Sequence, residues 1–520
     1  MTPRLQGRLL ALAGGAWFGL CWNPFFLAPT IPLAAFLFMR ALRGAGTGRE
    51  ALWIGLCFGA AKYIVGSHFL LWLTAWSVPL GIVIYLLAIG YILPQSMFEC
   101  WTARWLEERA GLPRSLGLAL VFTGVEKLRT VSDLSFPADL AAHAFGTHPA
   151  WLTWTPVIGP HGLTLLVFLI GYLLDLAWER RGDRRRAVTL AGLALALWCA
   201  PAINGWILDT TRDGNVRQVT EQTPRIGVVQ PFFEPDDKLI RDRWPGLWER
   251  LIRMTAEAAQ DSDLVVWPES TRPGPLIWRD GNKPRDPEME KIADRIGVPI
   301  LYGTEIAKLE QGKVRAIYNG AALVAPGRGL VDWYGKQRLL PLVEGVPFGD
   351  LIGWDPSKRD LDQKGYLTLL GNFTRGPEPT IFEVGDMRIG VLICYEGMYG
   401  ALGRTYRQQG ANMLVVMTND AWWGNSTFPP WHARMVAAQA RALRLPLLRA
   451  ANSGVSSWTD AAGAFGERTE LGKQAIMKVA LNPGTAPPTF YTERGDWLAW
   501  ACWLVLLGAF VRGLIAGRRS

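Results

Sequence analysis

The stretch Ile389-Gly-Val-Leu-Ile-Cys394-Tyr-Glu396 decides how this chain is interpreted. It predicts a short buried strand that ends at a thiol, just before a helix. Cys394 is the only cysteine in the long polar part of the chain, because the others lie in stretches apolar enough for lipid: Cys21, Cys57, Cys100, Cys199 and Cys502. A thiol at a strand end is a usual way to present a nucleophile. A small buried side chain without chemistry is the alternative.

The composition divides the 520 residues into parts of different character. Only 19% of the residues are charged, which is below the roughly 25% usual for soluble chains. The deficit lies in residues 1–208, predicted to form a membrane domain, and in 497–520, a closing transmembrane helix with a short basic tail. Residues 209–496 read like a soluble enzyme. The net charge of +9 comes largely from arginines beside the apolar segments, and no motif supports nucleic-acid binding.

Eight apolar segments approach the roughly 20 residues that a helix needs to cross a bilayer. They lie near 7–22, 24–40, 51–74, 78–100, 115–131, 160–178, 187–208 and 497–516. If the amino terminus is cytoplasmic, the inner connections hold the arginine clusters at 4–8, 40–49, 104–114, 180–186 and 518–519. The positive-inside rule then puts 209–496 outside the cytoplasm. The first segment has no cleavage site before Asn23-Pro24, so it predicts an uncleaved anchor.

Short apolar strands alternate with amphipathic helices in the polar part. Strands are expected at 226–230, 264–267, 299–304, 411–417 and 446–450, and helices at 243–260, 287–296, 397–409 and 430–444. Hairpins are expected for 316–324 with 329–335, for 380–384 with 387–394, and across 461–463. This order predicts an α/β sandwich with a mixed sheet.

Two polar residues follow strands in the manner of Cys394. Glu269 comes after Val265-Val266-Trp267-Pro268, and Lys336 follows the strand at 330–335. Pockets of α/β folds lie at such strand ends, where Glu269 could take the thiol proton and Lys336 could favour thiolate or stabilise an oxyanion. Taken singly, each residue could instead be a helix cap or a solvated surface charge.

Further candidates lie close to these three residues in the sequence. Glu344 follows Lys336 in a loop restricted by prolines, so it could orient the lysine or act as a second acid. The amide of Tyr395 is a candidate oxyanion donor, and Glu396 could order the turn or position the lysine. His432, the only histidine in 209–496, remains an alternative base. No Cys/His cluster has zinc-ligand spacing, so metal catalysis is not expected. No Gly-rich phosphate loop or dinucleotide-binding fingerprint is present either.

Several short runs together resemble a known superfamily. They are Trp267-Pro-Glu269-Ser, Tyr334-Gly-Lys336, Cys394-Tyr-Glu396, Asn419-Asp-Ala-Trp422 and Asn452-Ser-Gly454. The set resembles the nitrilase (carbon–nitrogen hydrolase) superfamily. With the multi-span amino-terminal region, the chain is similar over almost its full length to the bacterial apolipoprotein N-acyltransferases. Weaker matches in the membrane part are Glu126…Leu128-Arg129 and Phe136-Pro137.

The resemblance implies a fold and a reaction. The fold would be a multi-span helical membrane domain joined to an αββα sandwich. Cys394 would take an acyl chain from a phospholipid as a thioester, and the amine of a diacylglyceryl-cysteine on an apolipoprotein would then attack it. Glu269 would be the base and Lys336 the oxyanion-stabilising lysine. Assisting roles fall to Glu344, Tyr395 and Glu396, and substrate-binding roles to Asn419, Trp422 and Trp423. No cofactor is implied, and the place implied is a bacterial inner membrane with the catalytic domain on the periplasmic side.

The chain departs from the family pattern around Glu344, where Leu342-Val343 replace Phe-Gly and Gly345 replaces Tyr. Ala138 also stands where Trp is common. These changes leave room for altered donor or acceptor preference. Trp422, Trp423, Phe428 and Trp431 suggest either a lipid-facing loop or ordinary aromatic packing. The competing functions are a membrane-tethered amidase or nitrilase, and a non-catalytic scaffold or transporter.

Overall fold

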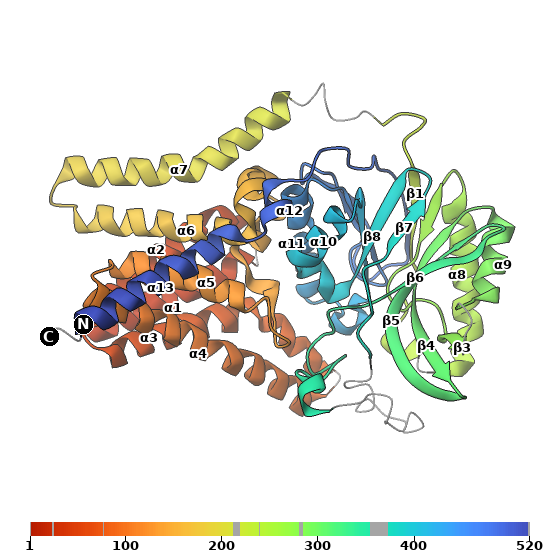
Figure 1. Ribbon diagram of the computed structural model, residues 1–520, viewed down its shortest axis with the longest axis horizontal. Coiled ribbons are helices and arrows are strands. Elements are labelled where there is room, and N and C mark those ends of the chain that lie inside the picture. The colour runs from red at the N-terminus through yellow and green to blue at the C-terminus, as the bar shows by residue number, and fades with distance from the viewer. Residues whose placement is uncertain are drawn as a thin grey trace.

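The computed structural model describes residues 2–22, 25–75, 77–211, 219–238, 240–279, 284–353 and 373–517. Figure 1 shows a bundle of helices at one end of the molecule and an α/β domain at the other. The predicted fold class, a helical membrane domain joined to an αββα sandwich, is confirmed. Asn23-Pro24 and the basic tail at 518–519 lie outside the described residues.

The helical domain holds the helices that correspond to the expected spans. They are α1 (Pro3–Trp22), α2 (Ile31–Arg43), α3 (Gly48–Gly66), α4 (Val78–Ala110), α5 (Arg114–Leu128), α6 (Thr155–Glu179), α7 (Arg184–Thr211) and α13 (Trp497–Gly517). Short 3-10 helices join them: η1 (Phe25–Thr30), η2 (His68–Ala75), η3 (Pro137–Asp139), η4 (Ala141–Phe145) and η5 (Pro149–Trp154). Glycines let some helices approach closely, since a side chain at Gly15 would meet the Phe58 carbonyl oxygen of α3.

Not every helix is long enough to cross a bilayer unaided. Within the described ranges, four helical segments meet the length and hydropathy that a span requires, or five if α3 and η2 form one bent span. The 13-residue α2 reaches only roughly 20 Å at 1.5 Å per residue, against about 30 Å for a hydrocarbon core. The count of eight spans therefore stays a prediction.

Two sheets form the centre of the α/β domain. The first has the order β13 (Ala475–Ala480), β1 (Arg225–Gln230), β2 (Leu264–Val266), β4 (Ile300–Glu310), β5 (Lys313–Ala325) and β6 (Gly329–Gly335), and β3 (Leu276–Arg279) also pairs with β4. The second has the order β12 (Phe465–Arg468), β11 (Ser457–Thr459), β10 (Leu447–Ala451), β9 (Met413–Thr418), β8 (Met387–Ile393) and β7 (Ile381–Val384). Both sheets mix parallel and antiparallel pairs.

Helices cover the outer face of each sheet, which gives the four layers (Figure 1). The helices α8 (Trp244–Ala259) and α9 (Pro287–Ile296) pack on the first sheet, and α10 (Gly400–Gln408) and α11 (Phe428–Leu443) pack on the second. The short α12 (Phe490–Arg494) leads back to α13. Because α11 also packs on η4, η5 and α6, the second helical layer is the junction with the helical domain. Trp431 of α11 stacks there on Trp22 of α1.

The expected strands and helices of the α/β domain are largely present, with three differences. The sequence missed β3 and β13, and it ended β4 at residue 304 although the strand continues to Glu310. The extension pairs with β5 across a turn at Gln311 and Gly312, both with positive φ. That turn lacks the Asn-Gly or Asp-Gly signal of a tight hairpin, so the sequence pattern did not reveal it.

Candidate active site

The nucleophile candidate stands at a sharp turn between β8 and a short helix. The strand ends at Ile393, and Cys394 begins the 3-10 helix η12 (Cys394–Met398) with φ of 51°. A residue other than glycine in this region carries roughly 1–3 kcal/mol of strain and persists only where its surroundings hold it. The parallel pairing of β8 with β9 places the end of both strands at one sheet edge. The turn therefore presents the thiol where β9 also ends, at Thr418.

Glu269 approaches this edge from the first sheet, and neighbouring groups hold both oxygens of its carboxylate. Asn319 Nδ2 donates to Oε1 at 2.7 Å, and the backbone N–H of Asn419 donates to Oε2 at 2.8 Å. Asn319 lies on β5 of the same sheet, whereas Asn419 follows β9 of the second sheet. The carboxylate of Glu269 thus spans the two sheets, and it is held in one orientation.

Lys336 enters from the end of β6 and is 1% exposed. Its Nζ lies 2.8 Å from the carboxylate of Glu344 and 3.7 Å from Oε1 of Glu269. Burial alone would lower the pKa of Lys336, but the negative charges of Glu344 and Glu269 outweigh burial and raise it. The lysine therefore keeps its positive charge inside the site.

The charges of Glu269 and Lys336 both act on the thiol of Cys394. Burial raises its pKa well above the ordinary value, and the charge of Glu269 raises it further, whereas the charge of Lys336 lowers it. The hydroxyl of Thr418 hydrogen-bonds to the thiol. At neutral pH the sulfur therefore keeps its proton until a base removes it. Cys394, Glu269 and the Lys336–Glu344 pair come from three separate parts of the sequence and meet in one site.

Asn319 is a site residue that the sequence did not reveal. Besides Glu269, its Nδ2 donates to Oε1 of Glu344 at 2.9 Å, so one amide group joins both carboxylates. It lies in the middle of the long strand β5. The strand-end signal that pointed to Glu269, Lys336 and Cys394 is absent there.

Glu396 is fully buried and links the nucleophile turn to the loop after β6. Its carboxylate accepts hydrogen bonds from the backbone N–H groups of Ile393, Gln337 and Arg338 and from the hydroxyl of Tyr334. Burial raises its pKa, and the charge of Lys336 and the backbone donors oppose that shift. These contacts fit the expectation that Glu396 orders the turn.

The side chain of Tyr395 points toward the helical domain. Its hydroxyl donates to the carbonyl oxygen of Ser135, and the hydroxyl of Tyr399 donates to that of Tyr395 at 2.7 Å. Ser135 lies between Arg129 and Asp139 in the sequence, and the side chains of these two residues form an ion pair at 2.6 Å. The helical domain therefore contacts the nucleophile turn directly.

The three expected substrate-binding residues have different surroundings. Asn419 contributes its backbone to Glu269, and its side chain accepts a hydrogen bond from Asn452 at 2.9 Å. Trp422 is half-buried. Trp423 packs on Phe69 of η2, with ring centroids 5.4 Å apart.

The nearby aromatic residues Phe428 and Trp431 are buried at the domain junction. Phe428 also packs on Phe69, with ring centroids 4.9 Å apart. For these two residues the structure therefore favours ordinary packing over a lipid-facing loop.

His432 is held by another buried group. Its Nδ1 lies 3.2 Å from Oδ1 of Asp420, whose other oxygen accepts a hydrogen bond from Arg449 at 2.6 Å. Burial lowers the pKa of His432, and the hydrogen bond to Asp420 opposes that shift. This arrangement favours a structural role for His432 and leaves Glu269 as the better placed base.

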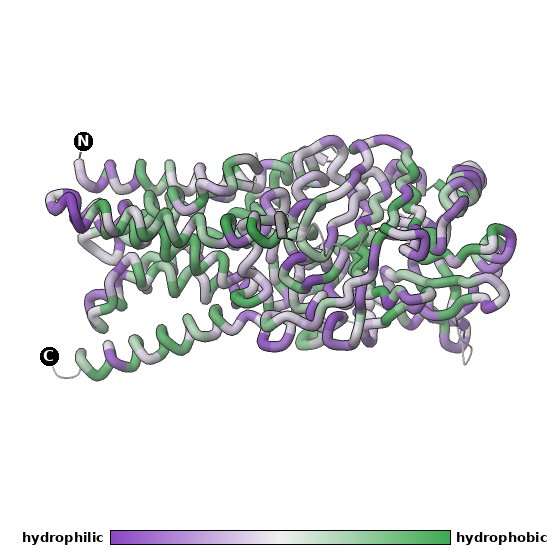
Figure 2. Tube along the Cα trace, turned by 90° about the horizontal axis from the view of Figure 1, so that it is seen from above, coloured by the Kyte–Doolittle hydropathy of each residue, from purple (hydrophilic) through white to green (hydrophobic). Residues whose placement is uncertain are grey.

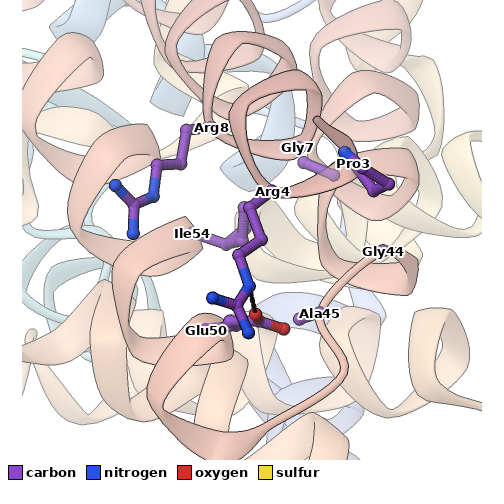
Figure 3. Close-up of a pocket in the computed structure, with 9 residues that line it drawn as sticks. Pro3, Arg4, Gly7, Arg8, Gly44, Ala45, Glu50 and Ile54 are labelled. Carbon is purple, nitrogen blue, oxygen red and sulfur yellow. Dashed lines mark ion pairs between the residues drawn. The ribbon is translucent and has the colours of Figure 1, made fainter. Parts of the chain in front are cut away.

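A small surface pocket lies elsewhere, at the free end of the helical domain. Figure 3 shows it around the ion pair of Arg4 with Glu50, and it is lined only by residues of α1 and by the α2–α3 region. None of the lining residues carries a nucleophilic side chain. It therefore contributes nothing to the site around Cys394.

Comparison with known proteins agrees with this architecture over the whole chain. Residues 226–485 match the carbon-nitrogen hydrolase family, and residues 14–173 match the apolipoprotein N-acyltransferase N-terminal domain. The apolipoprotein N-acyltransferase of Geobacter metallireducens is 28% identical over 99% of this chain and 95% of that protein. The corresponding protein of Azotobacter vinelandii is 29% identical over 96% of this chain and 93% of its own length.

Among solved structures, Nit3 of Saccharomyces cerevisiae, a member of branch 10 of the nitrilase superfamily, is similar to the α/β domain. It is 18% identical and covers 50% of this chain and 91% of its own, with a TM-score of 0.36. The family assignment comes from the sequence matches, which take in half of the chain in the α/β domain and most of the helical domain. The chain belongs to the carbon–nitrogen hydrolase family, among the members that carry the apolipoprotein N-acyltransferase amino-terminal domain.

Proposed function

We propose that this enzyme transfers a fatty acyl chain from a phospholipid, through a thioester on Cys394, to the amino-terminal amine of diacylated apolipoproteins. The full-length similarity to apolipoprotein N-acyltransferases supports the reaction class. The observation that carries the residue assignment is the meeting of a protonated thiol, a held carboxylate and a charged lysine at one sheet edge. The alternative of a small-amide hydrolase is not favoured, because the match extends through the helical domain.

In the first half-reaction, Glu269 takes the proton from the Cys394 sulfur as the sulfur attacks the ester carbonyl carbon of the phospholipid. The negative charge that forms on the carbonyl oxygen is stabilised by the ammonium of Lys336 and the backbone N–H of Tyr395. The intermediate then expels the alkoxide of the lysophospholipid, which takes the proton from Glu269. The acyl chain remains on sulfur as a thioester.

In the second half-reaction, the neutral amine of the diacylglyceryl-cysteine attacks the thioester carbonyl carbon. Glu269 accepts a proton from the attacking nitrogen, and the sulfur leaves as a thiolate beside Lys336. That thiolate then regains a proton from Glu269. A thioester suits this step because an amine attacks it readily, and cover over the site would limit competition from water.

Apolar side chains near the site fit lipid substrates. The loop after Lys336 exposes Leu342 by 61%, Val343 by 44% and Phe348 by 42%. The backbone N–H of Phe348 donates to Asp133 of the helical domain at 3.0 Å, so this loop lies at the junction of the domains. Exposed apolar side chains at such a position suit contact with acyl chains.

The enzyme is further proposed to be a multi-pass protein of a bacterial inner membrane, with the α/β domain on the periplasmic side. Figure 2 shows hydrophilic residues at the free end of the otherwise hydrophobic helical domain, opposite the α/β domain. Arg4, Arg40, Arg43 and Arg114 pair with carboxylates at that end. The positive-inside rule then assigns that end to the cytoplasm.

A reporter that is active only outside the cytoplasm tests this orientation. Fused after Thr220, beyond α7, it is expected to be active, whereas the same reporter fused after Gly182, between α6 and α7, is expected to be inactive. The reverse pattern would contradict the proposed orientation.

Asn319→Ala is expected to slow acyl-enzyme formation by about 10–100-fold, because small displacements of catalytic groups have effects of this size. The substitution removes the side-chain amide that donates a hydrogen bond to both Glu269 and Glu344. Rapid-quench measurement of acylated Cys394 checks this rate. Asn412→Ala is the matched control, since Asn412 bonds to Asp386 and Arg388 at the other end of β8. If Cys394 is acylated equally fast in Asn319→Ala and Asn412→Ala, Asn319 does not contribute to acyl-enzyme formation.

A further inference from the structure

Arg338 is a half-buried cation close to the active site that forms no ion pair with an acid in the described ranges. Its guanidinium lies over the ring of Tyr399, 5.7 Å from the centroid. No ion pair or side-chain hydrogen bond joins it to another described residue. The charge of Arg338 acts on Asp133, but that carboxylate already pairs with Arg375 at 2.8 Å and accepts a hydrogen bond from the backbone N–H of Phe348. Among the described residues, the charges of Arg338 and Arg375 therefore both act on Asp133, and only Arg375 pairs with it.

The position of Arg338 is fixed relative to the reacting groups. Its backbone N–H donates to Glu396 Oε1 at 2.9 Å, and the other oxygen of the same carboxylate accepts from Ile393, directly before Cys394. Arg338 also follows Lys336 by two residues. Tyr399, which supports its guanidinium, bonds through its hydroxyl to Tyr395. The backbone of Arg338 is thus tied to the nucleophile turn through Glu396, and its guanidinium rests on the ring of Tyr399 just after that turn.

The surroundings of Arg338 suit the polar end of a lipid. Asp133 belongs to the segment that joins the helical domain to the nucleophile turn, and the exposed Leu342 and Val343 follow Arg338 along its loop. A lipid that places its ester carbonyl at Cys394 carries its phosphate only a glycerol unit away. A planar guanidinium matches the oxygens of a phosphate better than any other side chain.

We propose that Arg338 binds the phosphodiester of the phospholipid that donates the acyl chain. This inference rests on the proposed function, because it concerns recognition of the donor at the same site. It also predicts which half-reaction depends on Arg338. The donor carries a phosphate and the diacylglyceryl-cysteine acceptor does not, so Arg338 acts in formation of the thioester and not in its breakdown.

The test compares two acyl donors that carry the same chain, a phospholipid and the phosphate-free p-nitrophenyl ester, both in detergent micelles. Acylation of Cys394 is followed by mass spectrometry against donor concentration. Arg338→Gln is expected to lower kcat/KM for the phospholipid by about tenfold, mainly by raising KM. The kcat/KM for the p-nitrophenyl ester is expected to stay within about twofold of the wild-type value. The substitution keeps the backbone N–H that Glu396 binds, and Arg338→Lys is expected to restore part of the loss.

Three further measurements complete the test. Arg315→Gln, at an exposed arginine on β5, is the matched control and is expected to leave both donors unchanged. Transfer from preformed acyl-enzyme to a diacylated peptide is expected to be equally fast in wild type and Arg338→Gln. Inorganic phosphate, compared with chloride at equal ionic strength, is expected to inhibit by less than about twofold. Strong inhibition that disappears in Arg338→Gln, together with an unchanged kcat/KM for the phospholipid in that variant, would assign the site to free phosphate and contradict the proposal.

An equal loss of kcat/KM with both donors in Arg338→Gln would also overturn the proposal, and so would slower transfer from its preformed acyl-enzyme. In either case Arg338 would support the whole site and not the phosphate of the donor alone. Failure of the wild type to become acylated by either donor would instead overturn the proposed function. The two failures are therefore distinguishable.

Discussion

Cys394→Ser is expected to reduce transfer of the acyl chain to a diacylated peptide by at least about a thousandfold. A serine hydroxyl has a far higher pKa than a thiol, and an oxygen ester is a poorer acyl donor to an amine than a thioester. The loss is expected even though the substitution is small and leaves the turn at Cys394 and the contacts of Glu396 in place. The measurement is the rate at which triacylated peptide appears in the presence of phospholipid.

Cys199→Ser provides the control for this prediction. Cys199 lies on α7, far along the helical domain, and is partly buried like Cys394. Its replacement is expected to leave transfer unchanged. Wild-type transfer by Cys394→Ser would show that transfer does not require a thioester on this residue, and an equal loss in both variants would point to damage of the fold.

Glu269→Gln is expected to slow thioester formation by about 10²–10⁴-fold, which is the contribution typical of a general base. The substitution keeps the size of the side chain and retains one oxygen to accept a hydrogen bond from Asn319 or Asn419. It removes the group that takes the thiol proton. Rapid-quench mass spectrometry of Cys394 after mixing with phospholipid measures the rate.

The same variant has an expected pH dependence. The charge of Glu269 raises the pKa of the Cys394 thiol, so its removal lowers that pKa and leaves the charge of Lys336 to favour thiolate. The residual rate of Glu269→Gln is therefore expected to increase with pH, by about tenfold per pH unit below the thiol pKa, because thiolate replaces base-assisted attack. Wild-type acylation by Glu269→Gln at neutral pH would remove Glu269 from the role of base.

The sequence revealed those parts of the site that stand at strand ends. Buried strands leave a clear apolar pattern, and the polar residue that follows each of them marks an edge where sites form. Cys394, Glu269 and Lys336 all carry this signal, and the structure brings them together. Most strands of the α/β domain were predictable for the same reason.

The remaining parts depend on contacts between distant segments. Asn319 lies inside β5, so only the packing of that strand beside the Glu269 loop gives it a role. The hydroxyl of Tyr395 reaches Ser135, which is 260 residues away in the sequence. The exposed loop after Lys336 gave no sign that Arg338 would rest on Tyr399. Periodicity reports which face of an element is buried but does not report which other element covers that face.

The most direct test of the proposed thioester is mass spectrometry of the wild-type protein after incubation with a phospholipid of defined acyl chains and without acceptor. We expect a mass increase of one acyl chain on the peptide that contains Cys394. Hydroxylamine should remove this acyl chain, as it removes a thioester, and addition of a diacylated peptide should also remove it. An unmodified Cys394, or an acyl chain found only on another residue, would contradict the proposed thioester.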